Sequence, residues 1–190
     1  ISWLTTMNSY GQIFGGFVSG NTIPDGFWTP SSPNGSSGTL SVSASYDSIT
    51  AANEYGQFLV SDSSLNAEGF KLFTPSSPNT DTGTLSYIKV VPPANTVFAS
   101  SLNNRGAVAL KVVPITYPVT GKYVQLAYIW KPDTNNGNTG RLTQIEVPEG
   151  FSNPGINRMN NTEDVAGSVQ RGADTFAPFV VSKGHFFVPQ

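Results

Sequence analysis

The clearest structural signal in the sequence is the stretch Thr39-Leu40-Ser41-Val42-Ser43-Ala44-Ser45-Tyr46. Its even-numbered residues are apolar, whereas the residues between them are threonine and serine. This alternation places the apolar side chains on one face of an extended chain and the hydroxyls on the other. The stretch is therefore predicted to be a half-buried β-strand.

Other stretches of the chain have the composition of strands. They are rich in β-branched and aromatic residues and end at Gly, Pro, Asn or Ser, which favour turns. These stretches are 57–60, 84–91, 107–116, 122–131, 141–147, 175–181 and 185–188. Helix signals are confined to two short excursions, at 48–55 and 162–170. About eight short strands without a long amphipathic helix predict an all-β fold, an antiparallel β-sandwich or barrel.

The strongest hairpin signal spans residues 107–131. A strand at 107–113 leads through Pro114 and a Pro/Gly turn at 117–121 into a second strand at 123–130. The second strand is apolar on both faces, and only Gln125 interrupts it. We therefore expect one face of this strand to meet the core and the other to be covered by a neighbouring element or subunit.

The composition excludes several classes of protein. The 190 residues contain 10 Lys+Arg and 12 Asp+Glu, so 12% are charged, against about 25% in an average domain. The absence of Cys rules out a disulfide framework and a cysteine metal site. Scattered basic residues predict weak or no direct nucleic-acid binding, and no apolar stretch is long enough for a membrane helix. We expect one domain over 1–190, with 1–37 as an N-terminal arm or loop-rich segment packed on it.

One internal repeat is visible. Thr29-Pro30-Ser31-Ser32-Pro33-Asn34 recurs as Thr74-Pro75-Ser76-Ser77-Pro78-Asn79, and Gly38-Thr39-Leu40-Ser41 recurs as Gly83-Thr84-Leu85-Ser86. Two copies are too few for a solenoid, which needs at least about three. The repeat is interpreted either as a stiff turn used twice or as a pair of recognition loops on one end of the fold.

Catalytic patterns are scarce. His185 is the sole histidine and lies in an apolar stretch, which favours a structural role. No Gly-x-Ser-x-Gly motif accompanies it. A glycosidase needs only two suitably spaced carboxylates, and the sequence does not select any pair among its acids. We predict that the chain is not an enzyme and uses no cofactor.

Two binding alternatives stay open. The loop from Asp133 to Asn138 resembles an oxygen-rich calcium loop but lacks further carboxylates, so no metal site within one chain is predicted. A calcium ion shared between subunits, with Asp133 as one ligand, is kept as an alternative. A sugar or receptor site would use Trp28, beside the repeated loop, and Trp130 as stacking platforms.

The stretch 106–133, which ends in Tyr128-Ile129-Trp130-Lys131-Pro132, resembles the paired strands of a capsid protein. The family concerned is the jelly-roll shell domain of small icosahedral RNA viruses, nodavirus-like ones in particular. Upstream, 56–60 and 87–93 lie where such domains have earlier strands. The resemblance covers about residues 50–150 and implies an eight-stranded jelly roll.

The resemblance, together with the low charge, predicts a structural capsid subunit of a virion that assembles with itself and with other capsid proteins. A receptor- or carbohydrate-binding head of a viral fibre or spike, or a secreted lectin-like module, is the alternative function, and a host receptor is its expected partner. No membrane partner is predicted. The subunit contact is expected at Tyr123, Gln125, Asp133, Asn135, Asn136 and Asn138.

Overall fold

The computed structural model describes residues 3–18, 22–43, 45–46, 48–61, 68–90, 94–114, 124–172 and 175–189. Over these residues the chain forms sixteen strands and no helix, which confirms the all-β prediction. No helix in this part of the chain could therefore span a membrane.

The strands pair in sequence order into four antiparallel sheets of four strands each. Sheet 1 comprises β1 (Trp3–Met7), β2 (Ile13–Gly16), β3 (Asp25–Pro30) and β4 (Gly38–Val42). Sheet 2 comprises β5 (Ser48–Ala52), β6 (Phe58–Ser61), β7 (Gly69–Pro75) and β8 (Gly83–Lys89). Sheet 3 comprises β9 (Ala94–Leu102), β10 (Val108–Pro114), β11 (Leu126–Pro132) and β12 (Gly140–Gln144). Sheet 4 comprises β13 (Phe151–Met159), β14 (Val165–Arg171), β15 (Thr175–Ser182) and β16 (His185–Phe187).

This local pairing differs from the expected topology. A jelly roll joins eight strands through two Greek keys, whereas each sheet here is a meander of consecutive strands. The eight-stranded jelly roll is therefore not confirmed. Residues 1–37 were expected as an arm or loop-rich segment, but β1, β2 and β3 lie within them and form most of sheet 1.

The two predicted helical excursions are wrong. Residues 48–55 contain β5, and 162–170 contain a turn followed by β14. In the second case the polar residues that suggested a helix cap serve the turn instead, because Asn160 Oδ1 accepts hydrogen bonds from the N–H groups of Thr162 and Asp164, each at 2.9 Å. Side-chain to backbone bonds of this kind suit turns as well as helix caps.

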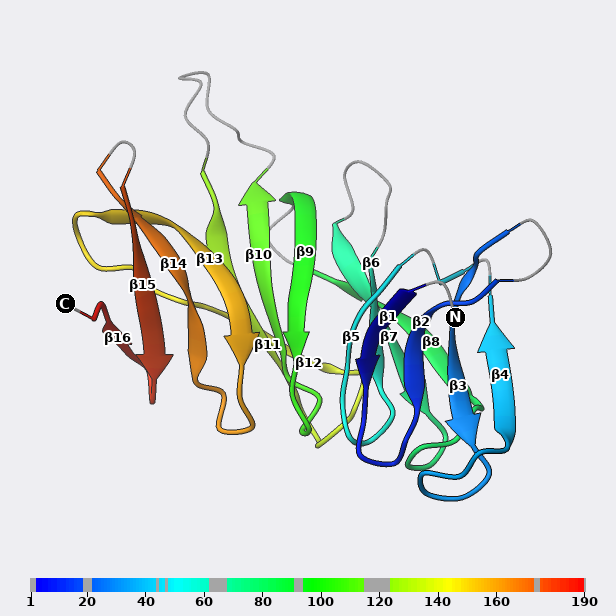
Figure 1. Ribbon diagram of the computed structural model, residues 1–190. Helices are drawn as coiled ribbons and strands as arrows, with labels where there is room; N and C mark the ends of the chain where they lie inside the picture. The colour runs from blue at the N-terminus through cyan, green and yellow to red at the C-terminus, as the bar shows by residue number, and fades with distance from the viewer. Residues whose placement is uncertain are drawn as a thin grey trace.

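The four sheets follow one another as a stack, from sheet 1 at the right of Figure 1 to sheet 4 at the left. The first strand of each later sheet lies against three strands of the preceding sheet: β5 contacts β1, β2 and β3, β9 contacts β5, β6 and β7, and β13 contacts β9, β10 and β11. Among the described residues, the substantial contacts between sheets all join sheets that are consecutive in the chain. The stack is therefore open at both ends.

Three apolar cores lie between the four sheets. Sheets 1 and 2 enclose Phe14, Phe27, Ile49, Phe58, Val60 and Phe73. Sheets 2 and 3 enclose Leu59, Phe70, Leu72, Ile88, Val90, Val97, Leu102, Val108, Leu110, Val112, Tyr128 and Trp130. Sheets 3 and 4 enclose Ala107, Ala109, Ala127, Ile145, Ile156, Met159, Val165, Val169, Phe179 and Val181.

β11 confirms the expectation for the doubly apolar strand. Tyr128 and Trp130 belong to the core shared with sheet 2, whereas Ala127 belongs to the core shared with sheet 4. The predicted hairpin is also present, since β10 pairs with β11 in antiparallel register. Both faces of the strand are apolar because sheet 3 lies between two other sheets.

Candidate functional site

Each sheet presents one row of cross-strand partners toward the preceding sheet, and we call this the leading row. The rows are Ala52-Phe58-Phe73-Leu85 in sheet 2, Leu102-Val108-Trp130-Leu142 in sheet 3 and Met159-Val165-Val181-Phe186 in sheet 4. All three rows are packed into the cores. The register therefore repeats the same interface three times.

The leading row of sheet 1 is Met7-Ile13-Trp28-Leu40, and none of its members belongs to one of the three cores. Met7 is 61% exposed and Leu40 is 48% exposed, while Ile13 and Trp28 are half-buried. The neighbouring Leu4 and Val42, on the same face, are also exposed. Sheet 1 thus carries an uncovered apolar face. By register, this face corresponds to the buried leading faces of sheets 2, 3 and 4.

The opposite end of the stack also has an uncovered face. We call the row that points away from the preceding sheet the trailing row, and in sheet 4 it is Arg158-Ala166-Val180-Phe187. Phe187 is 54% exposed, and Phe176 on the same face is 64% exposed. In sheet 1 the central residues of the trailing row, Phe14 and Phe27, are fully buried. Sheet 4 therefore ends the stack with apolar side chains in contact with solvent.

A ladder of asparagines connects the turns between the first two strands of the four sheets. Asn8 Nδ2 donates to Asn53 O at 3.3 Å, Asn53 Nδ2 donates to Asn103 O at 2.9 Å, and Asn103 Nδ2 donates to Asn160 O at 3.1 Å. Each asparagine also accepts, through Oδ1, the backbone N–H four residues later. Asn8, Asn53 and Asn103 are buried. These amides fix the spacing of consecutive sheets on one edge, the lower edge in Figure 1.

A second series of bonds runs beside the ladder. The N–H of Ser9 donates to Glu54 Oε2 at 2.7 Å, that of Glu54 to Asn104 Oδ1 at 3.1 Å, and that of Asn104 to Asn161 Oδ1 at 2.9 Å. Every step is donated by one turn to the next turn along the chain. The stack therefore has a polarity in its hydrogen bonds as well as in its packing.

The repeated Pro/Ser loop has a third copy, in which the Pro/Ser sequence itself is not repeated. The loops β3–β4, β7–β8 and β11–β12 each place an asparagine in the left-handed region, at Asn34, Asn79 and Asn136. The N–H groups of these residues donate to the carbonyls of Tyr10, Tyr55 and Arg105, at 2.8, 2.9 and 2.8 Å. The shared signal in the sequence is Asn-x-x-Gly before the second strand, at 8–11, 53–56 and 103–106.

The predicted subunit-contact residues have mixed positions. Tyr123 lies outside the described residues. Gln125 is 8% exposed, and it bonds Asn153 and Pro154 within the chain. Asn136 Oδ1 accepts a hydrogen bond from Asn53 Nδ2, so this residue joins sheets 2 and 3. The remaining three, Asp133, Asn135 and Asn138, are exposed in the β11–β12 loop.

The proposed stacking platforms and the histidine also differ in exposure. Trp130 is 3% exposed and meets the ring of Phe70 edge-on, so its faces are covered by protein. Trp28 lies half-buried in the uncovered leading row of sheet 1. His185 is exposed on β16, beside Phe187. Within the described ranges no three His, Cys, Asp or Glu side chains form a metal-binding group.

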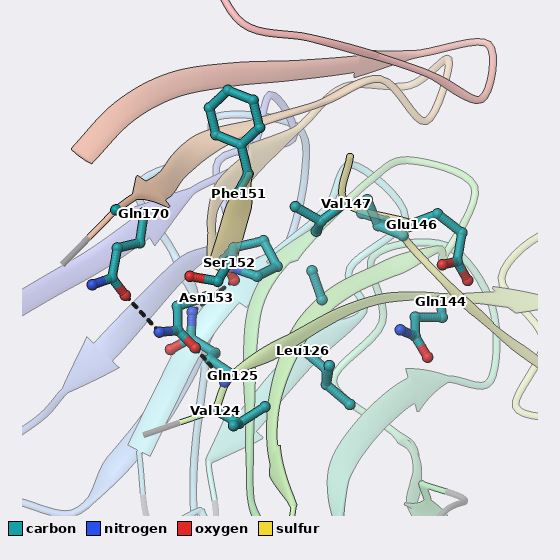
Figure 2. Close-up of a pocket in the computed structure, with 14 residues that line it drawn as sticks. Val124, Gln125, Leu126, Gln144, Glu146, Val147, Phe151, Ser152, Asn153 and Gln170 are labelled. Atoms are coloured by element: carbon teal, nitrogen blue, oxygen red, sulfur yellow. Dashed lines mark hydrogen bonds between the residues drawn. The ribbon is translucent and has the colours of Figure 1, made fainter. Parts of the chain in front are cut away.

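A cavity of about 810 Å³ is lined by residues of sheets 3 and 4 and of the segment that joins them (Figure 2). Its polar lining consists of four amides, one carboxylate and one hydroxyl: Gln125, Gln144, Asn153, Gln170, Glu146 and Ser152. Its apolar lining includes Val124, Leu126, Val147 and Phe151. This cavity could not be predicted from the sequence, because its walls come from four separate segments of the chain.

Hydrogen bonds hold one wall of the cavity in place. Asn153 Oδ1 accepts the N–H of Gln125 at 2.8 Å, and Asn153 Nδ2 donates to Gln170 Oε1 at 2.6 Å (Figure 2). On the other face of sheet 3, outside the lining of the cavity, Tyr128 Oη donates to Gln144 Oε1 at 3.1 Å. Burial raises the pKa of the Tyr128 hydroxyl, and the nearby negative charge of Glu146 raises it further. The tyrosine therefore stays a neutral donor at neutral pH.

The chain therefore has two candidate sites, the outward faces at the two ends of the stack and the cavity between sheets 3 and 4. One is a pair of apolar sheet faces suited to protein contacts. The other is a polar cavity with an aromatic wall. Comparisons with protein families, with curated proteins and with solved structures found no match to this chain.

Proposed function

We propose that this chain is a structural subunit that associates with copies of itself, in the setting of a virion. The observation that supports self-association is the uncovered leading row of sheet 1. Large exposed apolar patches on a soluble protein mark interaction sites. Here the row repeats the register of three rows that are buried against a neighbouring sheet.

The charge distribution supports the same function. Asp25 is the sole charged residue between positions 1 and 46. It is buried and accepts the N–H of Ile49 at 2.6 Å, so its carboxylate is directed toward sheet 2. The outer face of sheet 1 can therefore be buried without removing a charge from water, which would be costly.

The virion setting rests on the resemblance of 106–133 to capsid strands. The proposed partners are copies of the chain and other capsid proteins, and the proposed location is the virion. An interfacial calcium ion bound by Asp133 belongs to this proposal as an alternative, because Asp133 is exposed in the β11–β12 loop and available to a neighbouring subunit.

The test is the native mass of the purified chain as a function of concentration, measured by light scattering with electron microscopy of the same fractions. We expect the mass to rise above that of the 20.2 kDa monomer and regular assemblies to be visible. A mass that stays monomeric across the accessible range contradicts the proposal. Dissociation by a calcium chelator, abolished in Asp133→Ala, would assign the ion to Asp133.

A second candidate function, carbohydrate binding by a head domain, is favoured by the cavity between sheets 3 and 4. Amide and carboxylate groups can bond several hydroxyls at once, and an aromatic ring can stack on the apolar face of a sugar. Gln144 and Glu146 are exposed on one wall, and Phe151 supplies the ring. Trp130 cannot serve as the platform, since its ring is buried.

A glycan array tests this second function. Wild-type protein should retain a defined set of glycans, and Glu146→Ala should lose them. Glu149→Ala is the matched control, because Glu149 is an exposed carboxylate nearby that does not line the cavity. An array without wild-type signal, or one that Glu146→Ala leaves unchanged, contradicts carbohydrate binding in this cavity.

A further inference from the structure

We infer that copies of this chain stack head to tail, with the leading face of sheet 1 of one copy packed on the trailing face of sheet 4 of the next. The inference rests on the proposed self-association and names its partner surface. The contact would be a fourth instance of the interface that already joins sheets 1 to 2, 2 to 3 and 3 to 4.

The register of the sheets supports this contact. In each internal interface a leading row meets the trailing row of the preceding sheet. Sheet 1 has a free leading row and sheet 4 has a free trailing row, so the two faces left over are the two complementary halves of one interface. Stacking covers Met7 and Leu40 on one copy and Phe176 and Phe187 on the other.

The hydrogen-bond ladder has matching free ends. Asn53 O accepts from both Gly56 N–H and Asn8 Nδ2, whereas Asn8 O accepts from Gly11 N–H alone among the described residues. At the other end Asn160 Nδ2 donates to Asp164 Oδ2, which uses one of its two hydrogens. A stacked copy brings the second hydrogen of Asn160 to Asn8 O.

The second bond series ends in the same complementary way. Its last member, Asn161, accepts the N–H of Asn104. Its first member, Ser9, lies at the start of the series. In a stacked pair the N–H of Asn161 on one copy lies opposite the hydroxyl of Ser9 on the next, which continues the spacing of the three existing steps. Both bond series therefore select the head-to-tail direction.

Charge favours this arrangement over a symmetric one. Arg158 lies in the trailing row and is exposed, so two trailing faces packed together would place two like charges in one interface, whereas head-to-tail contact places one there. Two leading faces packed together would avoid this but leave Phe176 and Phe187 in water. Head-to-tail contact covers both apolar faces, and such heterologous contacts form closed rings or open filaments according to the rotation between copies.

The experiment uses one-sided variants of the full chain. Leu40→Asp places a charge on the leading face, and Phe187→Asp places one on the trailing face. Both sites are exposed, so the folded chain tolerates the change, which circular dichroism checks. Each variant alone should be monomeric, with self-association weakened about 100-fold or more because a charge would be buried at an apolar contact.

Mixing the two variants provides the decisive result. Leu40→Asp retains a working trailing face and Phe187→Asp retains a working leading face, so the mixture should form a one-to-one heterodimer and nothing larger, as seen by native mass spectrometry. Phe98→Asp, a change at an exposed aromatic residue on sheet 3, is the matched control and should assemble like the wild type.

The results of these experiments distinguish a failure of head-to-tail stacking from a failure of self-association itself. If wild-type chain stays monomeric, the proposed self-association fails. If wild type assembles and Phe187→Asp still assembles while Leu40→Asp does not, copies associate through leading faces and the head-to-tail inference is overturned. A mixture of the two variants that gives no heterodimer while wild type assembles also overturns it.

Discussion

Single glycines set the close approach of the two loops on the ladder edge. Gly11, Gly56 and Gly106 have φ values of 92°, 91° and 84°, a region that L side chains rarely adopt. A Cβ on Gly106 would lie 2.9 Å from the Cα of Asn136 in the β11–β12 loop. These glycines are therefore required both for their backbone conformation and for the space that they leave.

Gly106→Ala should destabilise the chain by about 1 kcal/mol for the left-handed backbone, and by roughly 1–3 kcal/mol more for the clash with Asn136. Gly150→Ala is the control, since Gly150 has a φ of 85° but no atom within 4 Å of its Cβ position. Chemical denaturation of both variants measures the difference. Equal losses would show that the two loops do not constrain Gly106.

The fourth turn departs from the glycine pattern. Glu163 occupies the corresponding position with a φ of 66°, and its carboxylate pairs with Lys131 at 2.9 Å. In the same turn, hydrogen bonds from Ser182, Asn160 and Thr162 lower the pKa of the Asp164 carboxyl to about 2. The ionised form of Asp164 is therefore part of the folded turn.

This shift predicts a loss of stability in acid. Because the folded pKa of Asp164 lies below its ordinary value of 3.8, its contribution is complete above about pH 4 and disappears as the pH falls through about 2. Asp164→Asn should lower stability at neutral pH and make the decline between pH 4 and 2 shallower. Thermal melts over this range measure it, with Glu149→Gln expected to follow the wild type. Parallel curves for wild type and Asp164→Asn would refute the prediction.

The turns between first and second strands act as one element through the asparagine ladder. Asn53 contributes most clearly, because its Oδ1 accepts the N–H groups of Tyr55 and Gln57 and its Nδ2 reaches Asn103 in the next turn. Asn53 is buried, so these groups have no water to replace a lost partner.

Asn53→Ala should therefore cost on the order of 2–4 kcal/mol, because several buried backbone groups lose their partner. Asn135→Ala is the matched control in an exposed loop and should stay within about 0.5 kcal/mol of wild type. Denaturant titration compares the two variants. A small effect of Asn53→Ala would mean that the ladder does not hold consecutive sheets together.

The strand β5 illustrates how packing overrides local preference. The acidic residue that precedes it suggested a short helix over 48–55. In the structure Ile49 is buried in the core with Phe58, and β5 pairs with β6. Burial of the apolar side chain and the ladder of backbone bonds outweigh the weak helix propensity of a five-residue stretch.

The molecule is a linear stack in which each sheet packs on its neighbours, and its stability should resemble a sum over sheets and interfaces. Phe179 is buried between sheets 3 and 4, far along the chain from the core that Leu110 shares with sheet 2. A cavity in one interface therefore acts mainly on the sheets beside it.

Phe179→Ala should cost about 3–5 kcal/mol at the last interface and unfold sheet 4 before the rest of the chain. Hydrogen exchange should then lose protection in β14 and β15 while β7 and β10 remain protected. Leu110→Ala, in the central core, is the comparison and should weaken sheets 2 and 3 together. A uniform loss of protection in Phe179→Ala would mean that the stack unfolds as one unit.

Part of this architecture could be predicted from residues alone. The doubly apolar stretch that became β11 indicates a strand, because a covered sheet is apolar on both faces. The period-two pattern at 39–46 predicted a half-buried strand, but β4 ends at Val42, and its apolar residues Leu40 and Val42 are exposed. The hairpin of β10 and β11 followed from the Pro and Gly residues between them. Local chemistry suffices for such elements because neighbouring residues define them.

The stacking, in contrast, was decided only by tertiary contacts. Sequence repetition was visible in the Pro/Ser loops of two sheets, but the third copy shares with them little beyond Pro132, Asn136, Gly140 and Leu142. The Asn-x-x-Gly motif recurs at 8–11, 53–56 and 103–106, but the motif does not show that these turns bond one another or the turn of Asn160. The sequence pattern also could not show that the apolar row of sheet 1 is exposed. Exposure of a sheet face depends on whether another sheet lies opposite it, and long-range packing alone determines this arrangement.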